Sequence, residues 1–148
     1  MSINWVATIL VVEDSRQELE LISCYLRDKG YNVIKATSAK EALEIVLEEK
    51  PDAIVTDVEM PGMSGFELCR VLKTNPTNQK RPIVICSSKN QAIQHLWAKK
   101  QGADAYITKP YTPEQLVSVI ESVEAVASLP DAKRSLLPRR GTLQFKIH

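Results

Sequence analysis

Long hydrophobic runs are missing from this sequence of 148 residues, and none approaches the ~20 apolar residues that a membrane-spanning helix needs. The first residues, 1–5, also lack the basic segment, apolar stretch and small-residue cleavage site of a secretory signal. We therefore predict a protein without membrane association. The cytoplasm is its expected compartment.

An excess of charge of one sign is missing as well, because 19 basic residues face 18 acidic ones. From Asp131 onward there is one acid and there are five basic residues: Lys133, Arg134, Arg139, Arg140 and Lys146. Taking these from the totals leaves 14 basic and 17 acidic residues, a net charge of −3, in the preceding part. Such an acidic body gives no support for nucleic-acid binding.

The sequence has only three cysteines, and their spacing matches no paired motif. Cys24, Cys69 and Cys86 lie far apart, form no Cys-x-x-Cys pair and each have apolar neighbours. This spacing argues against a metal or redox site. We interpret all three as reduced residues of the core.

Five short apolar runs bounded by turn signals are present, and each predicts a β-strand: 8–12, 32–36, 53–56, 83–86 and 105–107. Between them, apolar residues recur every three to four positions, as amphipathic helices require. Two examples are Leu19, Ile22, Tyr25 and Leu26, and Ala42, Leu43, Val46 and Leu47.

Helix boundaries agree with this alternation. Ser38 is followed three residues later by Glu41, a capping-box pattern, and Thr112 by Gln115. Gly30 and Gly102 follow the last turns of the first and fourth helices, where a left-handed residue commonly ends a helix. Strands that are almost entirely apolar suit a parallel sheet covered on both faces. The pattern predicts one α/β domain, a doubly wound parallel sheet of five strands.

Polar residues gather at the carboxyl ends of the predicted strands. Glu13 and Asp14 follow the first strand, Asp57 the third, Ser87 the fourth and Lys109 the fifth. Ligands of open parallel sheets bind at this edge. Three clustered carboxylates repel one another unless a cation lies between them, and oxygen ligands select a hard ion such as Mg²⁺.

The same set could hold a phosphoryl group, with Lys109 adding a positive charge and Ser87 a hydroxyl donor. A carboxylate can act as the nucleophile toward phosphorus and form an acyl phosphate when the charge on the phosphoryl oxygens is neutralised. Asp57 lies at the centre of this set. We predict that Asp57 accepts the phosphoryl group.

In order and spacing, four motifs between about residues 7 and 127 resemble those of response-regulator receiver domains: Val11-Val12-Glu13-Asp14, Thr56-Asp57-Val58-Glu59-Met60-Pro61-Gly62-Met63-Ser64-Gly65, Cys86-Ser87-Ser88 and Thr108-Lys109-Pro110. The resemblance implies a flavodoxin-like fold with strand order 2-1-3-4-5 and five helices. Residues 1–129 would form the receiver domain, and residues 130–148 a basic C-terminal extension.

The resemblance also assigns roles at the site. Asp14 and Asp57 would bind Mg²⁺ together with the backbone carbonyl of Glu59, and a sensor histidine kinase would phosphorylate Asp57. Glu13 stands where receiver domains more often have an aspartate. Its side chain is one methylene longer, so we expect it to contact the metal only through a water molecule. The junction of Lys109 and Pro110 would be a cis peptide. The protein would not be an enzyme beyond gaining and losing its own phosphoryl group.

The implied output face is formed by the fourth helix, fifth strand and fifth helix. Ser87 would contact the phosphoryl group while Tyr106 turns inward. Trp97, beside Lys99 on the fourth helix, is either a core residue or an interface anchor. The stretch 86–110 resembles the PilH-like class of twitching-motility regulators. That implies a motility or phototaxis pathway and a downstream target such as a component of the motility apparatus.

Other functions could use some of the same residues. A phosphate sink or an intermediate receiver of a phosphorelay would use the same site. An aspartate-nucleophile phosphatase would need a second acid two residues after the nucleophile, and Glu59 partly meets this requirement at that distance from Asp57. A flavin-binding protein would need a phosphate-binding loop rich in Ser, Thr or Gly after the first strand. A DNA-binding output domain does not fit the ~20 residues after Leu129.

The C-terminal residues need their own interpretation. Leu143, Phe145 and Ile147 alternate with polar residues, a strand pattern. The segment either packs on its own domain or pairs with the edge of another chain, which would allow self-association. A solvated basic tail is the alternative.

Overall fold

The computed structural model describes residues 6–128. Helices and strands alternate along this part of the chain, with one short 3-10 helix (η1): β1 Thr8–Val12, α1 Arg16–Asp28, β2 Asn32–Ala36, α2 Ala39–Glu49, β3 Ala53–Asp57, α3 Gly65–Thr74, η1 Pro76–Asn78, β4 Ile83–Ser87, α4 Ala92–Lys100, β5 Ala105–Thr108 and α5 Pro113–Ala127. None of the helices in residues 6–128 has the length and apolar character to cross a membrane.

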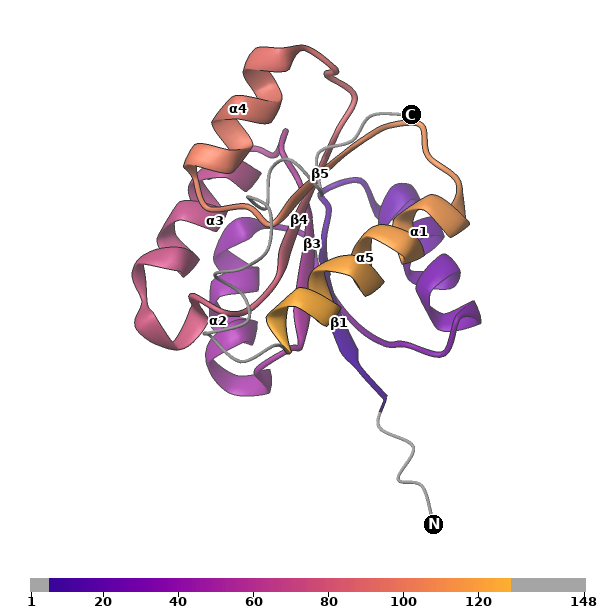
Figure 1. Ribbon diagram of the computed structural model, residues 1–148. Coiled ribbons are helices and arrows are strands. Elements are labelled where there is room, and N and C mark those ends of the chain that lie inside the picture. Colours follow the sequence, from indigo (N-terminus) through magenta and orange to yellow (C-terminus); the bar gives the residue numbers. More distant parts are fainter. Residues whose placement is uncertain (1–5, 129–148) are drawn as a thin grey trace.

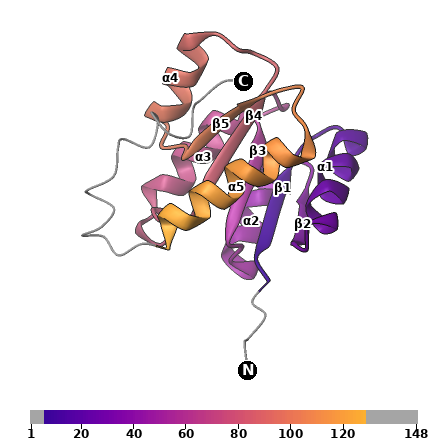
Figure 2. The ribbon, with the colours of Figure 1, turned by 45° about the vertical axis from the view of Figure 1, so that its right-hand side comes forward.

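The strands form one parallel sheet in the order β2-β1-β3-β4-β5. Helices α1 and α5 cover one face, and α2, α3 and α4 cover the other (Figures 1 and 2). The predicted five-stranded, doubly wound fold with five α-helices is confirmed. The strand order reverses between β1 and β3, so the crevice for a ligand is expected beyond the carboxyl ends of these two strands.

Strand residues supply two cores because successive side chains point to opposite faces. Ile9 and Val11 pack with α1 and α5, whereas Leu10 and Val12 pack with α2, α3 and α4. All four are 0–1% exposed. Burial on both faces explains why these strands are apolar throughout rather than alternating.

Capping follows the sequence pattern with one difference. Thr112 and Gln115 form the reciprocal capping box of α5. At α2, the Ser38 hydroxyl accepts from the amide of Glu41, but the Glu41 carboxylate accepts from the amide of Thr37 instead of Ser38. Gly30 and Gly102 have φ values of 94° and 92°, the left-handed conformation that was expected after α1 and α4.

Two expectations about helix faces were wrong. Cys24 is exposed, and only Cys69 and Cys86 are buried. Leu47 is 73% exposed although its spacing placed it with the apolar face of α2. Successive helical residues are turned by about 100°, so Cys24 lies about 200° around the helix from the buried Ile22.

Three strands run one residue further than their apolar runs, and these added residues are Asp57, Ser87 and Thr108. Asp57 pairs in register with Cys86, and Ser87 with Thr108. Hydrogen bonding of the ladder therefore extends into the polar edge and fixes its backbone. The C-terminal extension, with the strand predicted at 142–147, lies outside the described residues.

Candidate functional site

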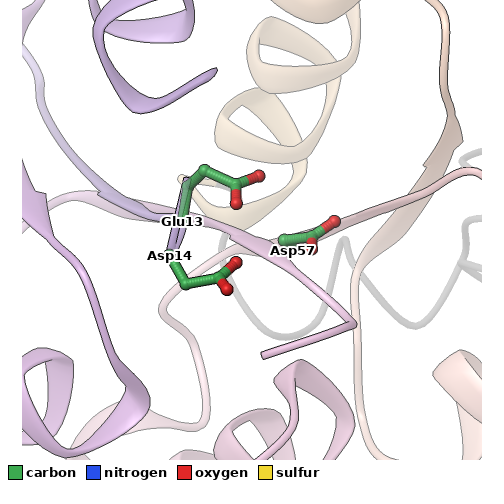
Figure 3. Close-up of side chains that lie close together, drawn as sticks. All are labelled: Glu13, Asp14 and Asp57. Atoms are coloured by element: carbon green, nitrogen blue, oxygen red, sulfur yellow. The ribbon is translucent and has the colours of Figure 1, made fainter. Parts of the chain in front are cut away.

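Three carboxylates converge at the reversal of strand order. Glu13 and Asp14 directly follow β1, Asp57 ends β3, and one carboxylate oxygen from each lies within 4.8 Å of the others. Figure 3 shows the three side chains projecting into the same region. Glu13 is buried, the Asp57 side chain is 11% exposed, and Asp14 is exposed. An all-oxygen donor set with one exposed member fits a hard divalent ion such as Mg²⁺.

The loop between β3 and α3 holds Asp57 in place. The amide of Gly65 donates to the carbonyl of Val58 at 2.9 Å, which brings the start of α3 against the end of β3. A Cβ atom at Gly65 would lie 2.1 Å from the carbonyl oxygen of Asp57. Gly62 has a φ of +78°. Gly62 thus provides the left-handed residue of the turn, whereas Gly65 is needed for the close approach of the backbone to Asp57.

Lys109 connects the carboxylates. Its Nζ donates to Glu13 Oε1 at 3.1 Å and to Glu18 Oε2 at 2.8 Å, and lies 3.1 Å from Asp57 Oδ1. Burial by itself lowers the pKa of Lys109, but the hydrogen bonds to Glu18 and Asp57 outweigh it and raise that pKa. The ammonium is therefore a fixed positive charge. The peptide between Lys109 and Pro110 is cis.

Glu13 and Asp57, the two more buried carboxylates, have raised pKa values, so their neutral forms are favoured. Burial raises the pKa of Glu13 to about 7, and a hydrogen bond with Glu18 adds to the effect. Burial also raises the pKa of Asp57, against the lowering effect of Lys109. Burial thus disfavours the charged forms of both carboxylates, and a bound cation would offset this effect.

Glu18 is a site residue that sequence reasoning missed. Ser15 caps α1 by accepting from the amide of Glu18, so Ser15 and Glu18 have the spacing of an ordinary capping box. In the structure, however, the Ser15 amide donates to Glu13 Oε2 at 3.0 Å, and the Glu18 carboxylate binds Lys109. The local pattern gave no reason to look for a partner 91 residues away.

Ser87 and Tyr106, the residues expected to respond to phosphorylation, both hydrogen-bond to the backbone of Lys89. Ser87 Oγ accepts from the amide of Lys89 at 3.1 Å, and the Tyr106 hydroxyl donates to the carbonyl of Lys89 at 2.6 Å. Both side chains are 1% exposed, so Tyr106 already points inward. The His95 ring lies 4.2 Å from the Tyr106 ring. A movement of Ser87 would therefore shift the Lys89 backbone and, with it, the hydrogen bond of the Tyr106 hydroxyl.

Helix α4 presents an apolar surface. Trp97 is 50% exposed, which excludes the core interpretation, and Ile93 and Leu96 are 51% and 49% exposed. Lys99 beside them is exposed.

Glu59, two residues after Asp57, has a half-exposed carboxylate 3.9 Å from Lys89 Nζ. The role of its backbone carbonyl stays a prediction.

Comparisons with known proteins agree with this geometry. Residues 9–121 match the response regulator receiver domain. The chain is 35% identical over 119 residues to protein PilH of Pseudomonas aeruginosa, which covers 80% of this chain and 98% of PilH. It is also 35% identical to the phosphate regulon regulator PhoB of the same organism, but it spans only 51% of PhoB.

Solved structures show the same relationship. The chemotaxis response regulator CheY4 of Vibrio cholerae is 30% identical with a TM-score of 0.76, covering 80% of this chain and 99% of CheY4. The receiver domain of a histidine kinase from Syntrophus aciditrophicus is 29% identical with a TM-score of 0.78, covering 86% and 96%. The chain described here belongs to the response regulator receiver family.

Proposed function

We propose that this protein is a phosphoacceptor of a two-component system and that Asp57 receives the phosphoryl group. The observation that carries the proposal is the Lys109 ammonium, 3.1 Å from Asp57 Oδ1, beside a cluster of three carboxylates at the carboxyl edge of the sheet. A nucleophilic carboxylate, a fixed cation and an oxygen-rich metal site are what such a transfer needs. We assign this function to residues 1–129 and keep 130–148 as a separate basic extension.

The reaction follows from these groups. A carboxylate oxygen of Asp57 attacks the phosphorus of a phosphohistidine, a P–O bond forms, and the P–N bond breaks. Its electron pair stays on the imidazole nitrogen, which takes up a proton from solvent. Lys109 neutralises charge on the transferring oxygens, and Ser87 turns its hydroxyl toward one of them. Because Ser87 and Tyr106 share Lys89, phosphorylation reaches the α4-β5-α5 face.

The donor set supports a Mg²⁺ site. Asp14, Asp57 and the carbonyl of Glu59 are the proposed ligands, and the ion would supply positive charge to the phosphoryl oxygens. Both oxygens of Glu13 already accept hydrogen bonds, from Lys109 and from the Ser15 amide. This supports contact between Glu13 and the ion only through water.

Partners follow from the family and its relatives. A sensor histidine kinase is the proposed donor, in the cytoplasm. Similarity to PilH favours motility as the pathway, with a component of the motility apparatus as target. Exposed Trp97 and Lys99 on α4 are the proposed contacts for that target. The phosphatase alternative is weaker, because the Glu59 carboxylate it would use as an acid lies by Lys89.

Incubation with Mg²⁺ and acetyl phosphate, followed by intact mass measurement, tests the proposal. Wild type should gain the mass of one phosphoryl group, while Asp57→Asn should gain none. Asp28→Asn is the matched control, because it makes the same change at an exposed acid of α1. Chelation of Mg²⁺ should abolish the gain. An adduct that persists in Asp57→Asn would exclude Asp57 as the acceptor.

A further inference from the structure

Within residues 6–128, carboxylates surround the Lys109 ammonium, which donates hydrogen bonds to Glu13 and Glu18 and forms an ion pair with Asp57. An ammonium group carries three N–H donors. Lys109 Nζ has three carboxylate partners, in Glu13, Asp57 and Glu18, at 3.1, 3.1 and 2.8 Å. A phosphoryl oxygen that approaches Lys109 therefore competes with these carboxylates for its donors.

Glu18 is the partner that can leave at least cost. The Glu13 side chain is 2% exposed, so its carboxylate would lose its compensation inside the protein, and Asp57 is itself the acceptor of the phosphoryl group. The Glu18 side chain is 49% exposed, and water can solvate its carboxylate once the contact breaks. An exposed ion pair is correspondingly weak, whereas a buried one is costly to break.

Glu18 also differs from the acidic cluster in position. It comes from the first turn of α1 and is not one of the three carboxylates that converge on the metal site. Hydrogen bonding to Glu13 and to Lys109 lowers the pKa of Glu18, so its carboxylate is charged at neutral pH. An anion at this point holds the Lys109 ammonium.

We propose that Glu18 is a positioning residue that binds Lys109 in the resting site, competes with the phosphoryl group for it, and thereby slows the loading of Asp57. The inference rests on the proposed function of Asp57. It gives this chain a built-in restraint on phosphorylation, because Lys109 must exchange a carboxylate for a phosphoryl oxygen during transfer.

The test compares Glu18→Gln with Glu20→Gln at saturating Mg²⁺. Both variants remove one negative charge from α1, but Glu20 pairs with Lys35 rather than with Lys109. Glu18→Gln should load phosphoryl groups from acetyl phosphate about two- to fivefold faster than wild type, in keeping with the modest strength of a half-exposed ion pair. Glu20→Gln should match wild type.

Binding of beryllofluoride, a phosphoryl mimic, provides a readout without turnover. Glu18→Gln should tighten this binding by a similar factor, whereas damage to the fold would weaken it. In a Lys109→Met background the gain from Glu18→Gln should disappear, because the residue acts through Lys109. A gain of unchanged size there would mean charge repulsion alone and would overturn the inference.

Two failures can be told apart. If wild type gains no phosphoryl group, the proposed function is wrong. If wild type is phosphorylated but Glu18→Gln loads no faster than Glu20→Gln, the function stands and the role of Glu18 is wrong.

Discussion

At the residue scale, the length of Glu13 shapes the site. Its carboxylate reaches Lys109 with one oxygen and the Ser15 amide with the other. Glu13 thus helps to fix both the lysine of the site and the N-terminus of α1. The cost is a carboxylate only 2% exposed whose pKa is raised to about 7 by burial. Position, rather than residue type alone, makes this acid part of the site.

The three cysteines should differ sharply in reactivity. Burial raises the pKa of Cys69 and of Cys86 to about 12, and the thiolate is the reactive form. Cys24 is exposed on α1. We expect native protein treated with iodoacetamide at pH 8 to gain one adduct quickly, at Cys24, as peptide mass spectrometry would show. Cys24→Ser should remove the fast adduct. Rapid modification of all three thiols in folded protein would contradict the burial described here.

At the element scale, the join between β3 and α3 controls how Asp57 is presented. Helix α3 starts against the backbone of the strand that ends in Asp57, with the Gly65 amide bound to the Val58 carbonyl. Ser64 caps α3 by accepting from the amide of Glu67. Strand end, turn and helix start therefore form one unit, and a change in the turn is transmitted to Asp57.

Gly65→Ala should damage this unit severely. Its Cβ would meet the carbonyl oxygen of Asp57 at 2.1 Å, so strand or helix must move. We expect a loss of at least about 3 kcal/mol in the free energy of unfolding, the range of the larger single-residue effects, together with slower phosphorylation. Urea titration measures the first effect.

Gly62→Ala is the matched control in the same loop. Its Cβ would meet nothing within 4 Å, although the φ of +78° disfavours a side chain. The expected loss is about 1–2 kcal/mol. Equal losses in the two variants would argue against close backbone approach as the reason for Gly65.

At the scale of the whole molecule, the fold assembles the site from distant segments. Glu13 and Lys109 are 96 residues apart in sequence and meet because β1 and β5 end at the same edge of the sheet. The acidic edge accumulates negative charge that folding alone does not compensate. Binding of a cation there should therefore stabilise the entire domain by mass action.

Mg²⁺ should raise the melting temperature of the protein. At a hundredfold excess over the dissociation constant, binding contributes about 2.7 kcal/mol, which corresponds to roughly 5–10 °C for a domain of this size. Differential scanning fluorimetry with and without Mg²⁺ measures the shift. Asp14→Asn should abolish most of it, while Asp28→Asn should keep it. A shift that survives in Asp14→Asn would place the ion elsewhere.

Much of the fold could be predicted from the sequence. Strands buried on both faces are apolar runs, and the five runs lie within one residue of the observed strands. Placing Asp14, Asp57 and Lys109 at one edge needed only the rule that parallel strands end on the same side. Helix faces were less certain, as Cys24 and Leu47 show, because an apolar residue can fall on either side of a short amphipathic helix.

The sequence by itself determined the alternation of elements, the parallel sheet and the set of residue types at its carboxyl edge, because these depend on local periodicity and on strand direction. Only the tertiary structure decided which atoms meet. It showed Glu18 at Lys109, Gly65 against Asp57 and Ser87 joined to Tyr106 through Lys89. Such contacts depend on side-chain reach and backbone spacing between segments far apart in the chain, which local patterns do not encode.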